Sequence, residues 1–251
     1  MSKYDSTNSI NTIFLDIGNS AIKAAFKKDG KWERASDNFK SVTYLISWLN
    51  NHTDSIGELV VASVRKDQFE LLQNQVNDQS IMNIRIEDIP LEKMDYNTPK
   101  TLGIDRYLGC LGAFKKVGKA VVVIDAGSAC TIDLMNDEGI YQGGVIMPGL
   151  QSLMNIFKIS APELPTIEPE IPSKWPGKST SDSLKWGQVG FFIDGIESAL
   201  NRYKKQYGDY ELFITGGDAE IISKLISTKP KKSDFLIYNG MEAFIKLRSF
   251  S

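Results

Sequence analysis

The chain of 251 residues is 42% hydrophobic and 24% charged, the composition of an ordinary soluble globular protein. Its net charge of -2 shows no excess of basic residues, so we expect no nucleic-acid partner. The longest apolar runs, such as Val121–Ile124, are far too short to span a bilayer, so we expect no membrane role.

The first part of the chain is predicted to alternate strands and helices. Thr12–Ile17 runs apolar around Asp16 and is followed by Gly18-Asn19-Ser20, which predicts a buried strand that ends in a tight turn. Asp29-Gly30 predicts a hairpin. The other strands expected here are Ala21–Phe26, Lys31–Arg34 and Glu58–Val64, and the helices are Val42–Asn50, Asp67–Val76 and a segment from near Asp105 to Lys116.

The same order of elements begins again near residue 120. Ala120–Ile124 predicts an apolar strand that ends in Asp125-Ala126-Gly127-Ser128, and strands Cys130–Met135 and Ile140–Val145 are expected to follow it. Asp16 and Asp125 are 109 residues apart (125 − 16), close to half the chain. An internal repeat of that size predicts two related α/β lobes, which we place at residues 12–116 and 117–251.

The last part of the chain is predicted to be mostly helical. Four prolines predict a loop at Ser160–Trp175. The long helical region after it is expected to be broken or bent near Gly187 and Gly190. The elements expected are the helical region Ser181–Tyr207, the strand Tyr210–Thr215, a helix through Ile226, a last strand Asp234–Tyr238 and a last helix Met241–Arg248.

The inventory of reactive side chains narrows the chemistry. His52 is the single histidine and lies in a polar stretch, so we expect a surface residue rather than a catalytic one. Cys110 and Cys130 lie in apolar segments without metal-ligand spacing, and unpaired thiols fit a reducing, cytoplasmic location. Met1–Thr12 has no signal-peptide pattern. We therefore expect chemistry based on carboxylates, hydroxyls, backbone amides and bound cations.

The first turn, Asp16 to Ser20, has the residues of a phosphate-binding loop. Its backbone N–H groups can surround phosphate oxygens, and Gly18 permits close approach of the backbone. Asp16 could hold a Mg²⁺ ion that bridges those phosphates. The alternative for this turn alone is an ordinary β-turn with a capping acid.

A matching acidic turn, Asp125 to Ser128, strengthens that interpretation. Two such turns, one from each lobe, are what a clamp around ATP requires, since one can face the β- and γ-phosphates while the other holds a cation. The alternative is a duplication without function in the second copy. A third glycine turn, Thr215 to Asp218, either passes beneath the nucleotide or is a plain strand-to-helix turn.

Between the repeats, a loop with a proline delivers Gly103 and then Asp105-Arg106 to the start of a helix. Asp105 could accept a proton from an attacking hydroxyl, and Arg106 could pair with an anionic substrate or with the transferred phosphoryl group. The alternative is a helix N-cap with a surface arginine. The segment Gly177–Thr180 ends like a P-loop but has Pro172 where a glycine is required, so it is not a Walker A motif.

Four motifs, in this order and spacing, resemble those of type III pantothenate kinases. They are Asp-x-Gly-Asn-Ser-x-x-Lys at Asp16–Lys23, Tyr-x-x-Pro-x-x-x-Gly-x-Asp-Arg at Tyr96–Arg106, Asp-x-Gly-Ser-Ala-x-Thr-x-Asp at Asp125–Asp133, and Gly-Gly-x-Ile-x-Pro-Gly at Gly143–Gly149. The resemblance extends from about residue 12 over nearly the whole chain. Serines stand at positions 20 and 128, where the family usually has threonine, so the hydroxyl is kept.

The resemblance implies a fold and a reaction. The family belongs to the acetate and sugar kinase, Hsp70 and actin superfamily, with two duplicated RNase H-like lobes, and it works as a homodimer. It transfers the γ-phosphoryl group of ATP to the terminal hydroxyl of pantothenate, the first step toward coenzyme A.

The resemblance also implies roles for the matching residues. Asp105 is the catalytic base, Asp125 binds a monovalent cation (K⁺ or NH₄⁺), and Mg²⁺ accompanies ATP. The implied ATP-binding residues are Asp16, Ile17, Gly18, Asn19, Ser20, Ala21, Ile22, Lys23 and Ser128. The implied pantothenate-binding residues are Tyr96, Gly103, Ile104, Asp105, Arg106 and Thr180.

Two other functions compete with this one. Another kinase of the same superfamily would act on a sugar or acyl substrate, but the segment Tyr96–Arg106 resembles the pantothenate site specifically. Some relatives of the family serve as accessory factors in transcription, and a degraded active site would mark such a protein. Asp16, Asp105 and Asp125 are all present, which favours catalysis.

Overall fold

The computed structural model describes residues 12–36, 38–52, 56–76 and 80–248, so nearly all of Met1–Thr12 lies outside the described residues. The chain folds into two compact units. The N-terminal unit comprises the chain up to Leu91, Asn97–Gly112 and the chain from Ile237 onward, and the C-terminal unit comprises Glu92–Tyr96 and Ala113–Leu236. The predicted lobe bounds, 12–116 and 117–251, stay a prediction. No helix in the described part of the chain is long and apolar enough to cross a membrane.

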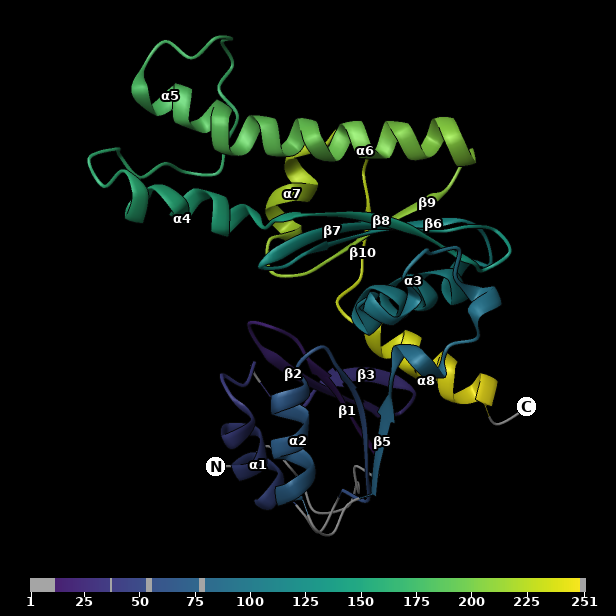
Figure 1. Ribbon diagram of the computed structural model, residues 1–251. Helices are drawn as coiled ribbons and strands as arrows, with labels where there is room; N and C mark the ends of the chain where they lie inside the picture. The colour runs from purple at the N-terminus through teal and green to yellow at the C-terminus, as the bar shows by residue number, and fades with distance from the viewer. Residues whose placement is uncertain (1–11, 37, 53–55, 77–79, 249–251) are drawn as a thin grey trace. The chain divides into compact units, whose positions relative to one another are not determined.

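The N-terminal unit is built on a five-stranded mixed sheet in the order β3-β2-β1-β4-β5 (Figure 1). β1 runs antiparallel to β2 and parallel to β4. Alternate residues of β1 enter the core with the apolar faces of α1 and α2, which explains the strand and helix periods in the sequence. The strands are β1 (Thr12–Ile17), β2 (Ile22–Lys28), β3 (Lys31–Arg34), β4 (Glu58–Ser63) and β5 (Ser80–Ile84).

The C-terminal unit repeats this topology. Its sheet has the order β8-β7-β6-β9-β10, in which β6 runs antiparallel to β7 and parallel to β9. β6 therefore occupies the place in its sheet that β1 occupies in the other, and the predicted duplication is confirmed. The strands are β6 (Val121–Ala126), β7 (Ala129–Met135), β8 (Tyr141–Pro148), β9 (Glu211–Thr215) and β10 (Lys231–Lys232).

Eight α-helices lie in the described part of the chain. A π-helical turn at Trp186–Gly190 joins α5 to α6, at the predicted bend. A side chain on Gly190 would overlap the Trp186 ring, so the glycine lets the ring lie against the helix backbone. The helices are α1 (Val42–Asn50), α2 (Lys66–Gln75), α3 (Ile104–Val117), α4 (Leu150–Ser160), α5 (Thr180–Lys185), α6 (Phe191–Tyr207), α7 (Ala219–Leu225) and α8 (Leu236–Arg248).

The hairpin prediction is confirmed, and the prediction for the end of the chain is wrong. Asp29 and Gly30 both have positive φ, 50° and 75°, as a two-residue type I′ turn requires. The predicted strand Asp234–Tyr238 instead leads into α8. Its short apolar run fits either element, and Gly240 is no turn residue. Gly240 lies inside α8, where a side chain would overlap the Leu108 carbonyl, so the glycine permits close approach of α8 to α3.

Candidate active site

The two acidic turns occupy equivalent places in the two sheets. Asp16 is the penultimate residue of β1 and lies beside Ala62 of the parallel strand β4. Asp125 is the penultimate residue of β6 and lies beside Thr215 of the parallel strand β9. Both carboxylates are half-buried. Each acid therefore stands at the carboxyl ends of two parallel strands, where α/β proteins bind ligands.

The turn after β1 is tight and open at its tip. The N–H of Gly18 donates to the carbonyl of Ala21 at 3.1 Å, while Asn19 and Ser20 are exposed. Lys23 is the antiparallel partner of Asp16, so its side chain leaves the sheet on the same face as the carboxylate. Backbone amides, an acid and a lysine are thus grouped where a Mg²⁺-nucleotide could bind.

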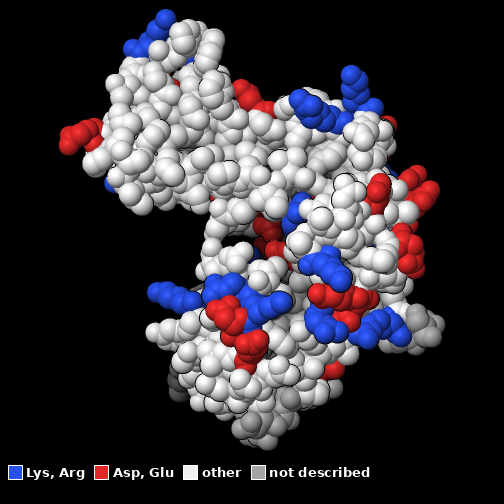
Figure 2. Space-filling view, viewed as in Figure 1, with Lys and Arg blue, Asp and Glu red and all other residues white. Residues whose placement is uncertain are grey.

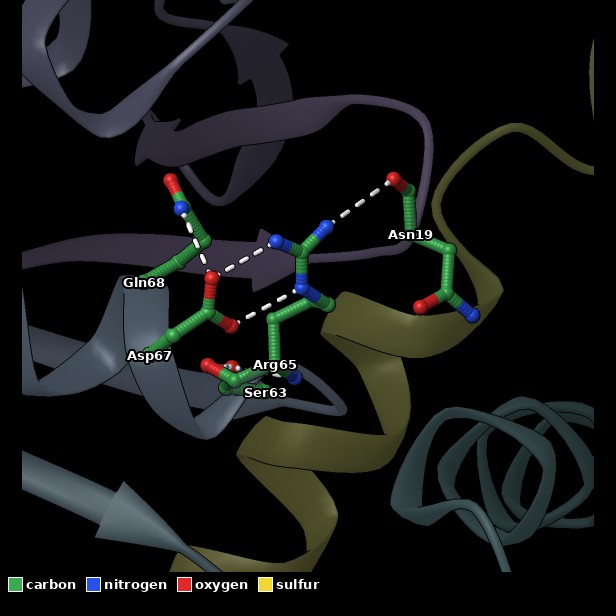
Figure 3. Close-up of polar contacts among 5 residues, drawn as sticks. All are labelled: Asn19, Ser63, Arg65, Asp67 and Gln68. Carbon is green, nitrogen blue, oxygen red and sulfur yellow. Dashed lines mark hydrogen bonds and ion pairs between the residues drawn. The ribbon is translucent and has the colours of Figure 1, made fainter.

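Arg65, which the sequence did not single out, lies against this turn (Figure 3). Its guanidinium donates to both carboxylate oxygens of Asp67, from Nε at 2.9 Å and from Nη2 at 2.7 Å, and Nη1 donates to the carbonyl of Asn19 at 3.5 Å. The hydrogen bonds from Arg65 hold the pKa of Asp67 well below its usual range. The only signal in the sequence is its place just after β4.

The predicted base, Asp105, lies in the first turn of α3. Its Oδ1 accepts the N–H of Arg106 at 2.9 Å, and both residues are half-buried. A side chain on Gly103 would overlap this same oxygen. Gly103 is therefore required for the observed position of the carboxylate, and the helix N-terminus favours its negative charge.

Helix α8 contributes a further residue near Asp16. Tyr238 is buried, and burial together with the charge of Asp16 raises the pKa of its hydroxyl well above the ordinary value. Its ring packs on Trp32, whose Nε1 donates to Asn239 at 2.9 Å. Sequence reasoning missed Tyr238 because this proximity depends on the return of the chain to the N-terminal unit.

The turn after β6 is more closely packed than the one after β1. A side chain on Gly149 would overlap the carbonyl of Gly127, and one on Gly216 would lie 2.5 Å from the backbone of Ala126. The N–H of Asp218 donates to the Ala126 carbonyl at 3.0 Å. The predicted third glycine turn is therefore joined to the second acidic turn.

Several carboxylates surround this second turn. Burial, with the charges of Asp125, Asp218 and Asp133, raises the pKa of Cys130 to about 12. The thiol accordingly stays protonated and is no nucleophile at neutral pH. The negative charges that oppose its ionisation would attract a cation to this end of the sheet.

The predicted pantothenate residues are divided between the two units. Gly103, Ile104, Asp105 and Arg106 belong to the N-terminal unit, and Tyr96 and Thr180 to the C-terminal unit. Tyr96 packs edge-on against buried Tyr141, with ring centroids 5.9 Å apart. Thr180 is exposed and begins α5, directly after Ser179, whose side chain caps that helix by accepting the N–H of Asp182. The P-loop-like segment is thus a helix cap.

The two sheets share one topology, and each carries an acid near the carboxyl end of its central strand. The sequence pattern of the type III pantothenate kinase family matches residues 12–202. Two type III pantothenate kinases are similar, one from Flavobacterium psychrophilum (34% identity; 89% of this chain, 94% of the relative) and one from Flavobacterium johnsoniae (32%; 89% and 93%). The chain belongs to the type III pantothenate kinase family. It is a kinase of coenzyme A biosynthesis that phosphorylates pantothenate.

Solved structures agree with this fold. A crystal structure from Campylobacter jejuni, described as a conserved protein of the Baf family of transcriptional activators, superposes with a TM-score of 0.65 at 25% identity and covers 95% of this chain and all of its own. The ethanolamine utilization protein EutJ from Carboxydothermus hydrogenoformans superposes with a TM-score of 0.52 at 10% identity, over 92% of this chain and 89% of its own, and shares the fold alone. The predicted α/β fold is confirmed, and the superfamily stays a prediction.

Proposed function

We propose that Asp105 is the catalytic base, and that the turn Asp16–Lys23 binds the phosphates of ATP together with Ser128 on the second turn. The observation that carries the proposal is the half-buried carboxylate of Asp105 at the start of α3, next to a glycine whose side chain would displace it. Such a fixed carboxylate suits phosphoryl transfer, in which positioning contributes more than strong basicity.

The proposed reaction is an in-line transfer. Asp105 accepts the proton of the terminal hydroxyl as that oxygen attacks the γ-phosphorus, and the bond from phosphorus to the bridging oxygen breaks to release ADP. Arg106 pairs with the carboxylate of pantothenate or with charge on the transferred group. Tyr96, Gly103, Ile104 and Thr180 complete the proposed pantothenate site.

The cations of the reaction have fitting residues in both turns. Asp16 would help to hold the Mg²⁺ ion that accompanies ATP, and the ion would supply positive charge to the phosphates. Asp125 is proposed to bind K⁺ or NH₄⁺. One carboxylate in an acidic neighbourhood, with backbone carbonyls at the strand ends, offers the oxygen ligands that a monovalent cation accepts.

A homodimer in the cytoplasm completes the proposal. Among the described residues, the C-terminal unit exposes several large apolar side chains around β8, α4 and the start of α6, and Figure 2 shows few charged side chains over α4 and α5. They are Ile146, Ile156, Ile159, Trp175 and Phe191. Exposed apolar surface of this kind marks interaction sites. Ile159→Glu should lower the mass measured by light scattering. The thiols of Cys110 and Cys130 are both buried. Two cysteines of this kind fit a reducing compartment.

The test of the proposed function is an assay of ADP release with pantothenate and with a panel of sugars. We expect ADP only with pantothenate, and more of it in K⁺ than in Na⁺. Release of ADP with a sugar alone would contradict the assignment of pantothenate as the substrate. No release of ADP with any acceptor would favour a regulator, the function that the Campylobacter jejuni neighbour's description suggests. The presence of Asp16, Asp105 and Asp125 supports the kinase.

A further inference from the structure

The segment that joins β4 to α2 is fixed by hydrogen bonds of its own. Ser63 Oγ donates to the carbonyl of Arg65 at 2.9 Å and accepts the N–H of Arg65 at 3.0 Å. The N–H of Val64 donates to the carbonyl of Ile17, the last residue of β1, at 3.2 Å. The backbone of Arg65 is therefore held next to the strand that leads into the phosphate-binding turn.

The side chain of Arg65 is fixed as well. Asp67 accepts from two guanidinium nitrogens and also from Gln68 Nε2 at 3.1 Å (Figure 3). A bidentate pair orients the planar guanidinium, and here it directs Nη1 to the Asn19 carbonyl. The side chains of Arg65 and Asp67 are 37% and 58% exposed, so the pair contributes little to folding. The pair therefore acts mainly by fixing the orientation of the Arg65 guanidinium.

The Asn19 carbonyl matters because of peptide geometry. The bond between Asn19 and Ser20 is trans, since the one cis peptide in the described chain lies elsewhere. In a trans peptide the C=O and the N–H point in opposite directions. A donor that holds the Asn19 oxygen therefore also sets the direction of the Ser20 N–H, and prevents the carbonyl from turning toward an anion.

We propose that Arg65 is a positioning residue for ATP, which orients the Asn19–Ser20 peptide so that its N–H rather than its carbonyl faces the phosphates. The inference rests on the proposed role of Asp16–Lys23 as the phosphate loop. Asp67 orients Arg65, and Gln68 supports Asp67. Without Arg65 the peptide can rotate, and ATP must pay the cost of ordering it on binding.

The experiment compares Arg65→Ala, Arg65→Lys and Arg85→Ala with the unmodified enzyme. Arg85 is exposed and forms an ion pair with the half-buried Asp88 in the same unit, at 3.2 Å, and it is the control for loss of an arginine–aspartate pair. Arg65→Ala should raise the KM for ATP about threefold to tenfold and leave the KM for pantothenate unchanged. Arg65→Lys should recover part of the loss, and Arg85→Ala should match the unmodified enzyme.

Direct binding without pantothenate separates positioning from a general loss of structure. Titration calorimetry should show that Arg65→Ala weakens the binding of ATP and leaves the binding of adenosine unchanged. The melting temperature should also stay unchanged. Equal loss for ATP and adenosine, or an unchanged KM for ATP, would overturn the inference. Asp16→Asn serves as the reference for the loop itself. If Asp16→Asn weakens ATP binding and Arg65→Ala does not, only the inference about Arg65 fails. If neither variant weakens ATP binding, the proposed phosphate loop is wrong, and the inference about Arg65 fails with it.

Discussion

The two acidic turns have the same place in duplicated sheets but different surroundings. Asp16 faces Lys23 across the strands, and Arg65 lies against the tip of its turn. Asp125 faces Thr131, and the neighbouring ionisable groups that act on Cys130 are acids. A basic environment suits phosphate and an acidic one suits a cation. The two turns thus have equivalent scaffolds, and the different residues around them support the proposal that they bind opposite ligands.

The N-terminal unit should accordingly carry the chemical step, and Asp105→Asn tests this most severely. The amide cannot accept the proton, so kcat should fall by about 10²–10⁴ while ATP affinity, measured by calorimetry, stays within a factor of about two. Asp209→Asn, at an exposed acid of the C-terminal unit, is the control. Turnover close to that of the unmodified enzyme would remove Asp105 from the mechanism.

A change at Gly103 tests whether position, and not only charge, makes Asp105 effective. Its new methyl group would overlap Asp105 Oδ1, so Gly103→Ala should lower kcat by about 10–100-fold with the carboxylate still present. Gly109→Ala is the control, because a methyl group at Gly109, within the helix that Gly103 precedes, meets nothing within 4 Å. If the two alanine variants have the same kcat, the carboxylate does not need its observed position.

The central strands and their turns were predictable from the sequence, because each is a short apolar run that ends in Asp, Gly and Ser. Of the residues that distinguish the two turns, Lys23 was predicted and Arg65 was not. Arg65 and Tyr238 act through tertiary contacts that no local pattern records. β5 has polar residues at two of its five positions, and α4 follows Gly149 without a side-chain cap, so neither was predicted.

Asp125→Asn tests the opposite assignment in the C-terminal unit. Loss of one negative ligand should lower kcat/KM roughly tenfold in K⁺, and it should abolish the difference between K⁺ and Na⁺. Asp16→Asn should weaken ATP binding and leave the ratio of the rates in K⁺ and Na⁺ unchanged. The comparison between the turns breaks down if Asp125→Asn keeps the full K⁺ preference.

The close packing of the second turn predicts a smaller effect, on stability. Gly216 has φ of 98° and approaches the Ala126 backbone, so Gly216→Ala should cost about 1–3 kcal/mol and lower the melting temperature by several degrees. Gly217→Ala, where a methyl group meets nothing within 4 Å, should melt like the unmodified protein.

Gly216 lies against Ala126, the residue directly after Asp125. The strain that Gly216→Ala introduces should therefore weaken cation binding at Asp125 as well as the stability of the fold. Gly216→Ala should therefore need more K⁺ for half-maximal activity at a temperature well below its melting point, while Gly217→Ala should not. A loss of stability with an unchanged K⁺ requirement would show that the packing supports the sheet alone, and that the second turn holds its ligand without help from the third.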